Sequence, residues 1–523
     1  MSDTLIQALQ DATCYDHPIG KIEIHETSAS WLLLTGEHAY KIKKSLNDGS
    51  LLDASTPDKR RRLGEREVRL NRRLYAERYL GVVPISGSPA SPRINDASAP
   101  IEYAVKMRRC SRRQLANVLQ VEDELYRESI DELIALMVDF HEQAATQDAP
   151  DRETPEVGAA TLDPLEEAFA SIRGCLDECL DDLEDRQTLE ALEQQAREMH
   201  ARLEDCFAAR RREGFLRKRL GSRAIEKALY RQSSDFADHE AGAAPRQGDV
   251  ACDLAFLLMD LESRNKTSFA NHSLNRYLEL SGDYSLVKVL GFYKLYHALD
   301  RARAAIIGYS QAMDSEKRQA LLSKYRHYLD LSRRYSCFQF PYLVIGVGVP
   351  GSGKSRFTAE MVQRLGSVRL RSDVERKRLH GFTHEASSAG KALYQPGATA
   401  RTYQRLAKLC GILLEASQTV CIDATCLKRE QRDLFRHQAE ARGLAVIIVS
   451  FEADPAVLER RIKKRAQRSG ESPDASLEIL KRQLRRFDAF DDDERRYLVR
   501  LDTTAANASE TLVDLIQQQV RIV

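Results

Sequence analysis

The chain has 523 residues, of which 43% are hydrophobic, enough for about two or three domains with full cores. Its 79 basic and 78 acidic residues leave a net charge of +1, which implies no overall attraction to nucleic acid or to a membrane surface. No apolar run approaches the roughly 20 residues that a membrane span needs, and residues 1–12 lack a signal-like apolar stretch. Because the ten cysteines are scattered, we expect reduced thiols and a cytoplasmic protein.

The N-terminal region has the pattern of a small sheet. Three short segments of alternating polarity, separated by turn residues, predict strands. A helix follows, and a further strand is expected beyond a loop rich in Pro and Ser, Ser88–Pro100. In chain order the expected elements are the strands Lys21–Thr27, Ser30–Thr35 and His38–Ile42, the helix Lys59–Tyr75 and the strand Glu102–Met107.

This order resembles the small lobe of the aminoglycoside-phosphotransferase and protein-kinase-like fold. The resemblance implies an ion pair between Lys41 on the third strand and Glu67 on the helix. The segment Gly248–Leu261 reads G-D-V-A-C-D-L-A-F-L-L-M-D-L, which is typical of the stretch after the catalytic centre of that fold. The similarity covers most of residues 1–330 in scattered pieces, and it implies a two-lobe domain.

The catalytic motif of that fold is degenerate in this chain. Kinase-like phosphotransferases use H-G-D-x-x-x-x-N to supply the acceptor base and a metal-binding Asn. Here Leu220 stands at the His position, Ser222 at the base and Lys227 at the Asn, and no apolar strand follows within Tyr230–Gln247. We expect a structural or regulatory domain, although a gene-model error within 217–247 would give the same pattern.

A phosphate-binding loop is the strongest signal in the chain. Gly348–Ser355 reads G-V-P-G-S-G-K-S, and it follows the apolar run Tyr342–Val347 and precedes a helical pattern. In such a loop the backbone N–H groups and the helix N-terminus surround an anion. We expect ATP to bind here, with Lys354 on the β- and γ-phosphates and the Ser355 hydroxyl on Mg²⁺. The expected nucleotide-binding residues are Gly348, Gly351, Ser352, Gly353, Lys354 and Ser355.

Two acidic residues follow the next apolar strands. Asp373 comes just after Val368–Leu370, and Asp423 ends the strand that begins at Thr419. Because ligands bind at the carboxyl ends of parallel strands, both should lie near the phosphate loop. Asp373 is a candidate general base for an attacking hydroxyl, or an N-cap of the following helix, and the two roles are compatible. Asp423 is a candidate partner of Mg²⁺, with a turn-forming Asp as the alternative.

A basic segment supplies the last candidates. Arg461 and Arg465 are four residues apart, so they share one face of a helix, and the polar stretch Gln467–Ser476 follows. Beside a phosphate loop we interpret them as lid arginines that neutralise charge developing during transfer. Without the loop, we would interpret this basic run as a solvated helix face.

Further apolar runs at 446–451 and 497–501 complete five strands that alternate with helices. This alternation predicts a doubly wound parallel sheet of α/β type, in a domain that spans 336–523 and follows an α+β domain at 1–335.

The C-terminal third resembles the P-loop kinases of the polynucleotide-kinase and gluconate-kinase type, including predicted bacterial kinases with an AAA-type ATP-binding domain. The matching pieces are the phosphate loop, R-S-D at Arg371–Asp373, D-A-T at Asp423–Thr425 and R-I-x-x-R at Arg461–Arg465. The resemblance implies that Asp373 activates the acceptor hydroxyl and that the arginines form the lid. The whole chain resembles a bacterial fusion of the two kinds of domain.

Two classes of function remain open. One is an ATP-dependent kinase that acts on a hydroxyl, with a nucleic-acid 5′-OH ranked ahead of a small metabolite. Arg371, Arg376 and Arg378 are candidate clamps for an acceptor phosphate. The other is an ATP-binding switch that acts through the degenerate domain. Asp373 favours transfer, since a switch needs a water-positioning residue instead. The sequence does not define the oligomeric state.

Overall fold

The computed structural model describes residues 2–19, 22–26, 30–45, 56–72, 79–96, 98–108, 127–147, 162–180, 182–230, 247–382, 395–469 and 473–522. The chain forms two compact units. Unit 1 comprises Met1–Thr146 and Lys218–Arg246, and unit 2 comprises Gln147–Arg217 and Gln247–Val523. The helices within 163–212 and 251–336 therefore belong to the same unit as the C-terminal third. The expected division into domains at 1–335 and 336–523 stays a prediction.

Unit 1 contains a six-stranded sheet in the order β1-β2-β3-β6-β4-β5, and all of its strand pairs are antiparallel. Its strands are β1 (Ile22–Glu26), β2 (Ser30–Thr35), β3 (His38–Lys43), β4 (Tyr79–Ser88), β5 (Ser91–Ile94) and β6 (Pro100–Arg108). Its helices are α1 (Ser2–Ala8), η1 (Ala12–Cys14), α2 (Pro57–Arg72), α4 (Arg127–Gln147) and α7 (Ser222–Tyr230). Trp31 and Tyr40 lie in its buried core. The expected strands and helix of this region are confirmed, whereas the kinase-like fold stays a prediction.

The expected loop at Ser88–Pro100 is wrong in part, because it contains β5, and the strand β4 before it was missed. Gly81, Pro84 and Gly87 make β4 resemble a loop in sequence, and the chain tolerates them through register irregularities and a tight hairpin. Gly87 has φ +91°, and a Cβ there would lie 2.5 Å from the carbonyl oxygen of Ser91. Only glycine fits that turn.

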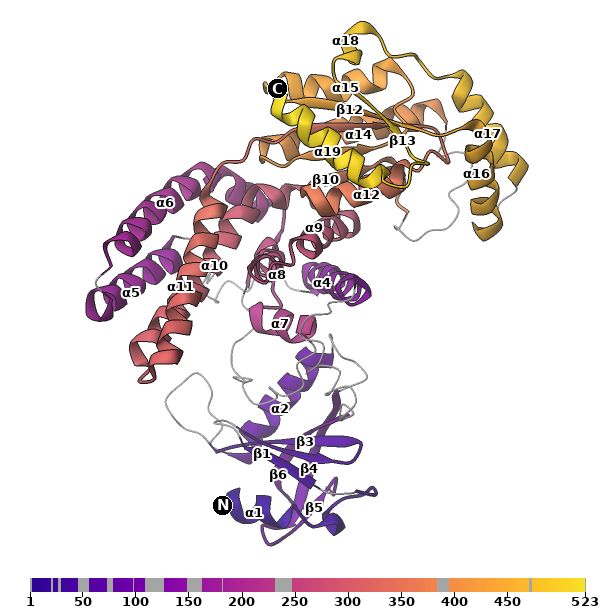
Figure 1. The fold of residues 1–523 in the computed structure, drawn as a ribbon. Helices are drawn as coiled ribbons and strands as arrows, with labels where there is room; N and C mark the ends of the chain where they lie inside the picture. Colours follow the sequence, from indigo (N-terminus) through magenta and orange to yellow (C-terminus); the bar gives the residue numbers. More distant parts are fainter. Residues whose placement is uncertain are drawn as a thin grey trace. The chain divides into compact units, whose positions relative to one another are not determined.

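The helical part of unit 2 packs around one long helix, α10 (Figure 1). Eleven consecutive residues of α8, Ala251–Leu261, are buried. A buried ion pair reinforces this core, since Arg210 contacts both Asp249 and Asp283 at 2.6 and 2.9 Å. The helices are α5 (Asp163–Cys179), α6 (Leu183–Arg212), α8 (Ala251–Ser263), α9 (Thr267–Ser281), η2 (Tyr284–Leu286), α10 (Val287–Gln311) and α11 (Ser315–Ser336). Short strands β7 (Leu216–Lys218) and β8 (Gln247–Asp249) pair with each other.

The rest of unit 2 is a five-stranded parallel sheet in the order β10-β11-β9-β12-β13, which confirms the expected parallel α/β architecture. Its strands are β9 (Leu343–Val347), β10 (Val368–Arg371), β11 (Val420–Asp423), β12 (Val446–Glu452) and β13 (Leu498–Asp502). Its helices are α12 (Lys354–Leu365), α13 (Ser372–Leu379), α14 (Pro396–Glu415), α15 (Arg429–Glu440), α16 (Pro455–Ser469), α17 (Pro473–Arg485), α18 (Asp492–Arg495) and α19 (Ala508–Ile522).

Helices cover both faces of this sheet (Figure 1). Val344, Ile447 and Val449 pack with α12 and α19 in one apolar core, while α14 and α15 contact the other face. Every residue of β9 is buried, as expected for the central strand of a doubly wound sheet. The chain order reverses about β9, so ligands are expected beyond its carboxyl end.

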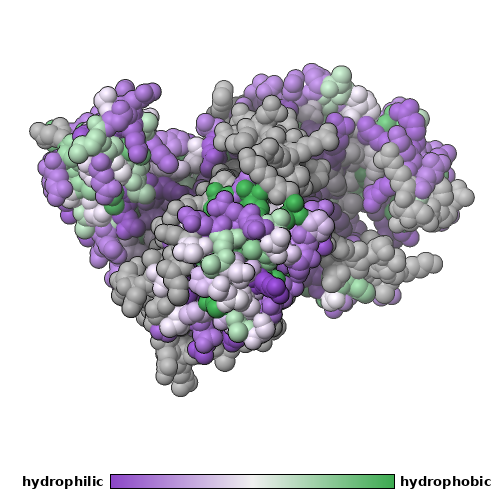
Figure 2. Space-filling view, turned by 90° about the horizontal axis from the view of Figure 1, so that it is seen from below, coloured by the Kyte–Doolittle hydropathy of each residue, from purple (hydrophilic) through white to green (hydrophobic). Residues whose placement is uncertain are grey.

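On the face seen in Figure 2, the apolar residues among the coloured ones form small groups between hydrophilic residues. None of the helices within the described ranges is both long enough and apolar enough to cross a membrane.

Candidate active site

The phosphate loop leaves β9 and enters α12 through a glycine-dependent backbone. Gly351 and Gly353 have φ values of +83° and +88°, the left-handed region that favours glycine. A Cβ at Gly348 would lie 2.6 Å from the Ser352 Oγ, so this glycine makes room for the loop to fold over itself. The Gly348 N–H donates to the carbonyl of Thr425 at 3.2 Å, which anchors the loop to the end of β11.

The Ser352 hydroxyl is a buried polar group of the phosphate loop. Ser352 is only 1% exposed, and its Oγ has no hydrogen-bond partner among the described residues. A buried hydroxyl without a partner costs free energy, which a bound acceptor would recover. Together with the N-terminus of α12, this orphaned donor suits a phosphate group.

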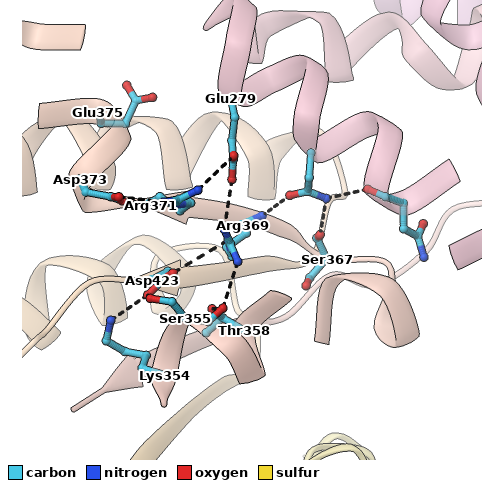
Figure 3. Close-up of polar contacts among 12 residues, drawn as sticks. Glu279, Lys354, Ser355, Thr358, Ser367, Arg369, Arg371, Asp373, Glu375 and Asp423 are labelled. Carbon is cyan, nitrogen blue, oxygen red and sulfur yellow. Dashed lines mark hydrogen bonds and ion pairs between the residues drawn. The ribbon is translucent and has the colours of Figure 1, made fainter. Parts of the chain in front are cut away.

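Asp423 lies at the centre of the charged groups beside the loop (Figure 3). Its Oδ1 accepts from the Lys354 Nζ at 2.7 Å and from the Ser355 Oγ at 3.3 Å. Its Oδ2 lies 3.9 Å from the Arg369 Nε. Burial raises the pKa of Asp423, but the charges of Lys354 and Arg369 outweigh it and hold the pKa below its ordinary value. Asp423 is therefore an ionised carboxylate at neutral pH.

Asp373 lies at the same edge of the sheet, two residues beyond the end of β10. The last residues of β10 and β11, Arg371 and Asp423, are register partners. The Arg371 guanidinium donates to both oxygens of Asp373, at 3.2 and 2.8 Å. Desolvation raises the pKa of Asp373, but the charge of Arg371 and its hydrogen bonds outweigh this and keep the pKa below its ordinary value.

The alternative interpretation of Asp373, as the N-cap of the next helix, is wrong. β10 continues directly into α13, which begins at Ser372, and the cap residue is Arg371. Asp373 therefore lies in the first turn of α13, with a side chain that is 56% exposed. An exposed carboxylate next to a phosphate loop can be reached by an acceptor, which suits the expected base.

The two candidate lid arginines lie on α16. Arg461 Nη1 donates to the carbonyl of Gly351 at 3.2 Å and to the Thr503 Oγ1 at 3.0 Å. α16 also packs closely on the loop, because a Cβ at Gly351 would lie 3.0 Å from the carbonyl oxygen of Leu458. Arg465 follows one turn later and is exposed. Arg461 thus contacts the phosphate loop itself, and the lid role of both arginines stays a prediction.

Arg371 and Arg378, which were proposed to clamp an acceptor, make hydrogen bonds and ion pairs within the chain. Arg371 binds Asp373 and also Glu279, whose Oε2 lies 3.3 Å from its Nη1. Arg378 donates to Glu375, which is buried, and to the backbone carbonyl of Glu279 at 2.6 Å. These contacts weaken the expectation that Arg371 and Arg378 clamp an acceptor phosphate.

The sequence reasoning missed Glu279 and Asn275 of α9 entirely. Asn275 Oδ1 accepts from the Arg369 N–H at 2.7 Å, and its Nδ2 donates to the carbonyl of Ser367 at 3.0 Å. These residues lie about ninety positions before their partners in the chain, within a helix that has no phosphate-binding motif. No local pattern of the sequence points to them.

The expected kinase-like pair in unit 1 is described only in part. Lys41 is 1% exposed, and the side chain of Glu67 lies outside the described ones. Ser222, at the position of the missing base, begins the helix α7. The Lys227 side chain and residues 231–246 lie outside the described part of the chain, so the degenerate motif stays a prediction.

Comparison with known proteins is consistent with the geometry of the loop. Residues 343–490 match the family model of an AAA domain. Over 483 residues the chain is 27% identical to an uncharacterised protein of Mycobacterium tuberculosis, with 90% of this chain and 91% of that protein covered. An uncharacterised protein of Mycobacterium bovis matches with the same identity and coverage.

Several solved structures resemble about a third of the chain. A putative kinase from Chloroflexus aurantiacus is 16% identical, covers 35% of this chain and 98% of its own, and has a TM-score of 0.29. A gluconokinase from Sinorhizobium meliloti is 23% identical, covers 35% and 97%, and has a TM-score of 0.25. The APS kinase CysC of Mycobacterium tuberculosis is 20% identical, covers 34% of this chain and 98% of its own, and also has a TM-score of 0.25. At these TM-scores the likenesses transfer no activity to this chain.

Proposed function

We propose that the chain is an ATP-dependent kinase, in which the C-terminal α/β part transfers the γ-phosphate to an acceptor hydroxyl. One observation carries the proposal. Two carboxylates with opposite surroundings stand at the carboxyl ends of adjacent strands, beside a phosphate loop. Asp423 is buried under Lys354, whereas Asp373 is exposed. The first suits the nucleotide side of a transfer site, and the second suits the acceptor side.

The donor side fits a nucleoside triphosphate with a hard divalent cation. The Ser355 hydroxyl and the Asp423 carboxylate lie 3.3 Å apart and supply the oxygen ligands that Mg²⁺ prefers. When bound, the cation would neutralise charge on the phosphates. Lys354 follows directly after the loop glycines. When a nucleotide binds, its ammonium group would move from Asp423 to a phosphate and so exchange one anionic partner for another. The proposed donor is ATP.

The acceptor side rests on Asp373. Its pKa lies below its ordinary value, so it is ionised at neutral pH and accepts a hydrogen bond from a hydroxyl group. In a loose phosphoryl-transfer transition state the base mainly orients the attacking hydroxyl, and the proton of that hydroxyl leaves late. A carboxylate of low pKa is adequate for this role. Arg461 and Arg465 are proposed to stabilise charge on the phosphates in transit.

The acceptor is proposed to be a nucleic-acid 5′-OH, ahead of a small metabolite. This ranking rests on the resemblance to polynucleotide kinases and on the basic segment 460–468. Arg371 and Arg378 add no support for it, because both are engaged with groups of the chain. A small polyol or nucleoside is the second candidate, and those same contacts favour it, because they leave fewer cations beside Asp373 for a polyanion.

The N-terminal domain, 1–335, is proposed to be a degenerate aminoglycoside-phosphotransferase-like module with a structural or regulatory role, joined to the kinase domain at 336–523. We place the protein in the cytoplasm. An ATP-binding switch acting through the degenerate module is the alternative to transfer, and the two differ in whether any acceptor gains phosphate.

The test is γ-phosphate transfer from labelled ATP with Mg²⁺ to a 5′-OH oligonucleotide and, separately, to a panel of polyols and nucleosides. Label on the oligonucleotide, suppressed by salt as counterion release requires, supports the first acceptor. Label on a small molecule alone moves the proposal to a metabolite kinase. ATP hydrolysis with no labelled acceptor, unchanged in Asp373→Asn, would contradict the kinase proposal and favour the switch.

A further inference from the structure

One carboxylate of the helical segment reaches into the candidate site. Glu279 lies in the last turn of α9 and is 7% exposed. Its Oε1 accepts from the Arg369 Nη2 and its Oε2 from the Arg371 Nη1, each at 3.3 Å. In Figure 3 a dashed line joins this side chain to each arginine, with Asp373 beyond Arg371 and Asp423 beyond Arg369.

The two arginines belong to the same strand, and their positive charges lie close together. Residues 369 and 371 are two positions apart on β10, so their side chains project from the same face of the strand. Their guanidinium groups would repel each other in this partly buried place, with side chains only 11% and 25% exposed. A carboxylate with one oxygen on each arginine removes that repulsion and fixes their spacing.

Glu279 itself has little freedom, because α9 is fastened to β10. This strand is at the edge of the sheet, and the Asn275 side chain hydrogen-bonds to the backbone of Arg369 in the strand and of Ser367 just before it. Near the C-terminal end of α9, Arg378 donates a hydrogen bond to the backbone carbonyl of Glu279. Gly282 permits that approach, since a Cβ there would lie 2.7 Å from the Arg378 Nε.

The consequence falls on Asp373. Arg371 is shared between Glu279 on one side and Asp373 on the other, with two hydrogen bonds to Asp373. Arg369 also donates a hydrogen bond to the carbonyl of Ser355 at 3.2 Å. Through Arg369, the Oε1 atom of Glu279 is therefore linked to the helix that follows the phosphate loop. The chain of contacts therefore runs from the phosphate loop through Glu279 to Asp373.

We infer that Glu279 is a positioning residue for phosphoryl transfer: it holds Arg371 in the orientation that places Asp373 against the acceptor hydroxyl. The inference rests on the proposed function and adds a second part of the chain to it. The helical segment, which carries no nucleotide motif, thus supplies part of the geometry of the transfer site.

The test measures steady-state transfer at varied ATP concentration in the full chain with Glu279→Gln, which keeps the shape and removes the charge. We expect kcat to fall about tenfold or more, since a misplacement of ~1 Å can cost about 100-fold, while the KM for ATP stays unchanged. Glu279→Asp should recover part of the rate. In an Asp373→Asn background, Glu279→Gln should cause no further loss, because the two residues act through one contact chain.

Glu262→Gln is the matched control. Glu262 is also a partly buried carboxylate of the helical segment with two partners, Lys294 at 2.7 Å and the Tyr335 hydroxyl, and it contacts none of the strand residues discussed here. It should lower thermal stability to a similar degree and leave kcat intact.

The outcomes separate the two proposals. Wild-type protein that transfers no phosphate overturns the proposed function, and this inference with it. Wild-type protein that transfers normally overturns the inference alone if Glu279→Gln keeps full kcat, if its loss adds to that of Asp373→Asn, or if Glu262→Gln lowers kcat equally.

Discussion

Removal of the phosphate-loop lysine should destabilise the protein as well as prevent nucleotide binding. Lys354→Met deletes the ammonium group that lies 2.7 Å from Asp423, in a pair whose side chains are 12% and 3% exposed. Loss of one partner from a buried pair costs roughly 3–5 kcal/mol. We expect about 3 kcal/mol, at the low end of that range, because Ser355 and Arg369 still face the carboxylate.

Urea unfolding measures this loss, and the chain provides an internal reference. Its single tryptophan, Trp31, is buried in unit 1, so its fluorescence reports unit 1 alone. Far-UV circular dichroism also follows the helices of unit 2. Lys354→Met should move the circular-dichroism transition to lower urea and leave the fluorescence transition in place.

A second substitution separates charge from packing. Asp423→Asn added to Lys354→Met removes the carboxylate that has lost its lysine and should recover most of the lost free energy of unfolding, while ATP binding by calorimetry stays absent in both variants. Lys294→Met, which breaks another 2.7 Å ion pair of unit 2, is the control and should leave ATP binding intact. A Lys354→Met protein as stable as wild type, or one that binds ATP normally, would refute the reasoning.

Three further outcomes are expected. Lys41→Ala should lower the stability of unit 1, because Lys41 is 1% exposed, yet leave phosphoryl transfer unchanged; a large loss of transfer in a folded variant would show that unit 1 takes part in turnover. The folded pKa of Asp423 lies below its unfolded value of 3.8, so its contribution to stability is present above that value and lost as the pH falls through the folded pKa. Unit 2 should therefore weaken below about pH 4, and less steeply in Lys354→Met with Asp423→Asn; equal pH dependence would contradict the assignment. Gly351→Ala should abolish ATP binding, since its φ of +83° and the Leu458 carbonyl 3.0 Å from a Cβ both oppose a side chain, and normal affinity in calorimetry would show that the loop tolerates the change.

Much of the C-terminal part is predictable because its signals are local. The phosphate loop combines glycines, lysine and serine in one octapeptide, and continuous apolar runs mark strands that are buried on both faces. The parallel sheet and the meeting of Asp373 and Asp423 at one edge follow from those runs and from the rule for carboxyl ends of strands.

The rest depends on contacts between distant segments. Glu279 reaches Arg371 across 92 residues, and an acidic residue near the end of an amphipathic helix looks like any solvated one. Strand β4 was missed for another reason. Its Gly81, Pro84 and Gly87 have low strand propensity, and the pairing with β6 that overrides this propensity is tertiary.

The most direct test of the central claim is the fate of the γ-phosphate in a single turnover with wild-type and Asp373→Asn protein. The account predicts that wild-type protein moves the label from ATP to an acceptor hydroxyl, and that Asp373→Asn slows this step by about 100-fold or more at unchanged ATP affinity. Equal transfer rates in the two proteins, or label released only as inorganic phosphate, would contradict it.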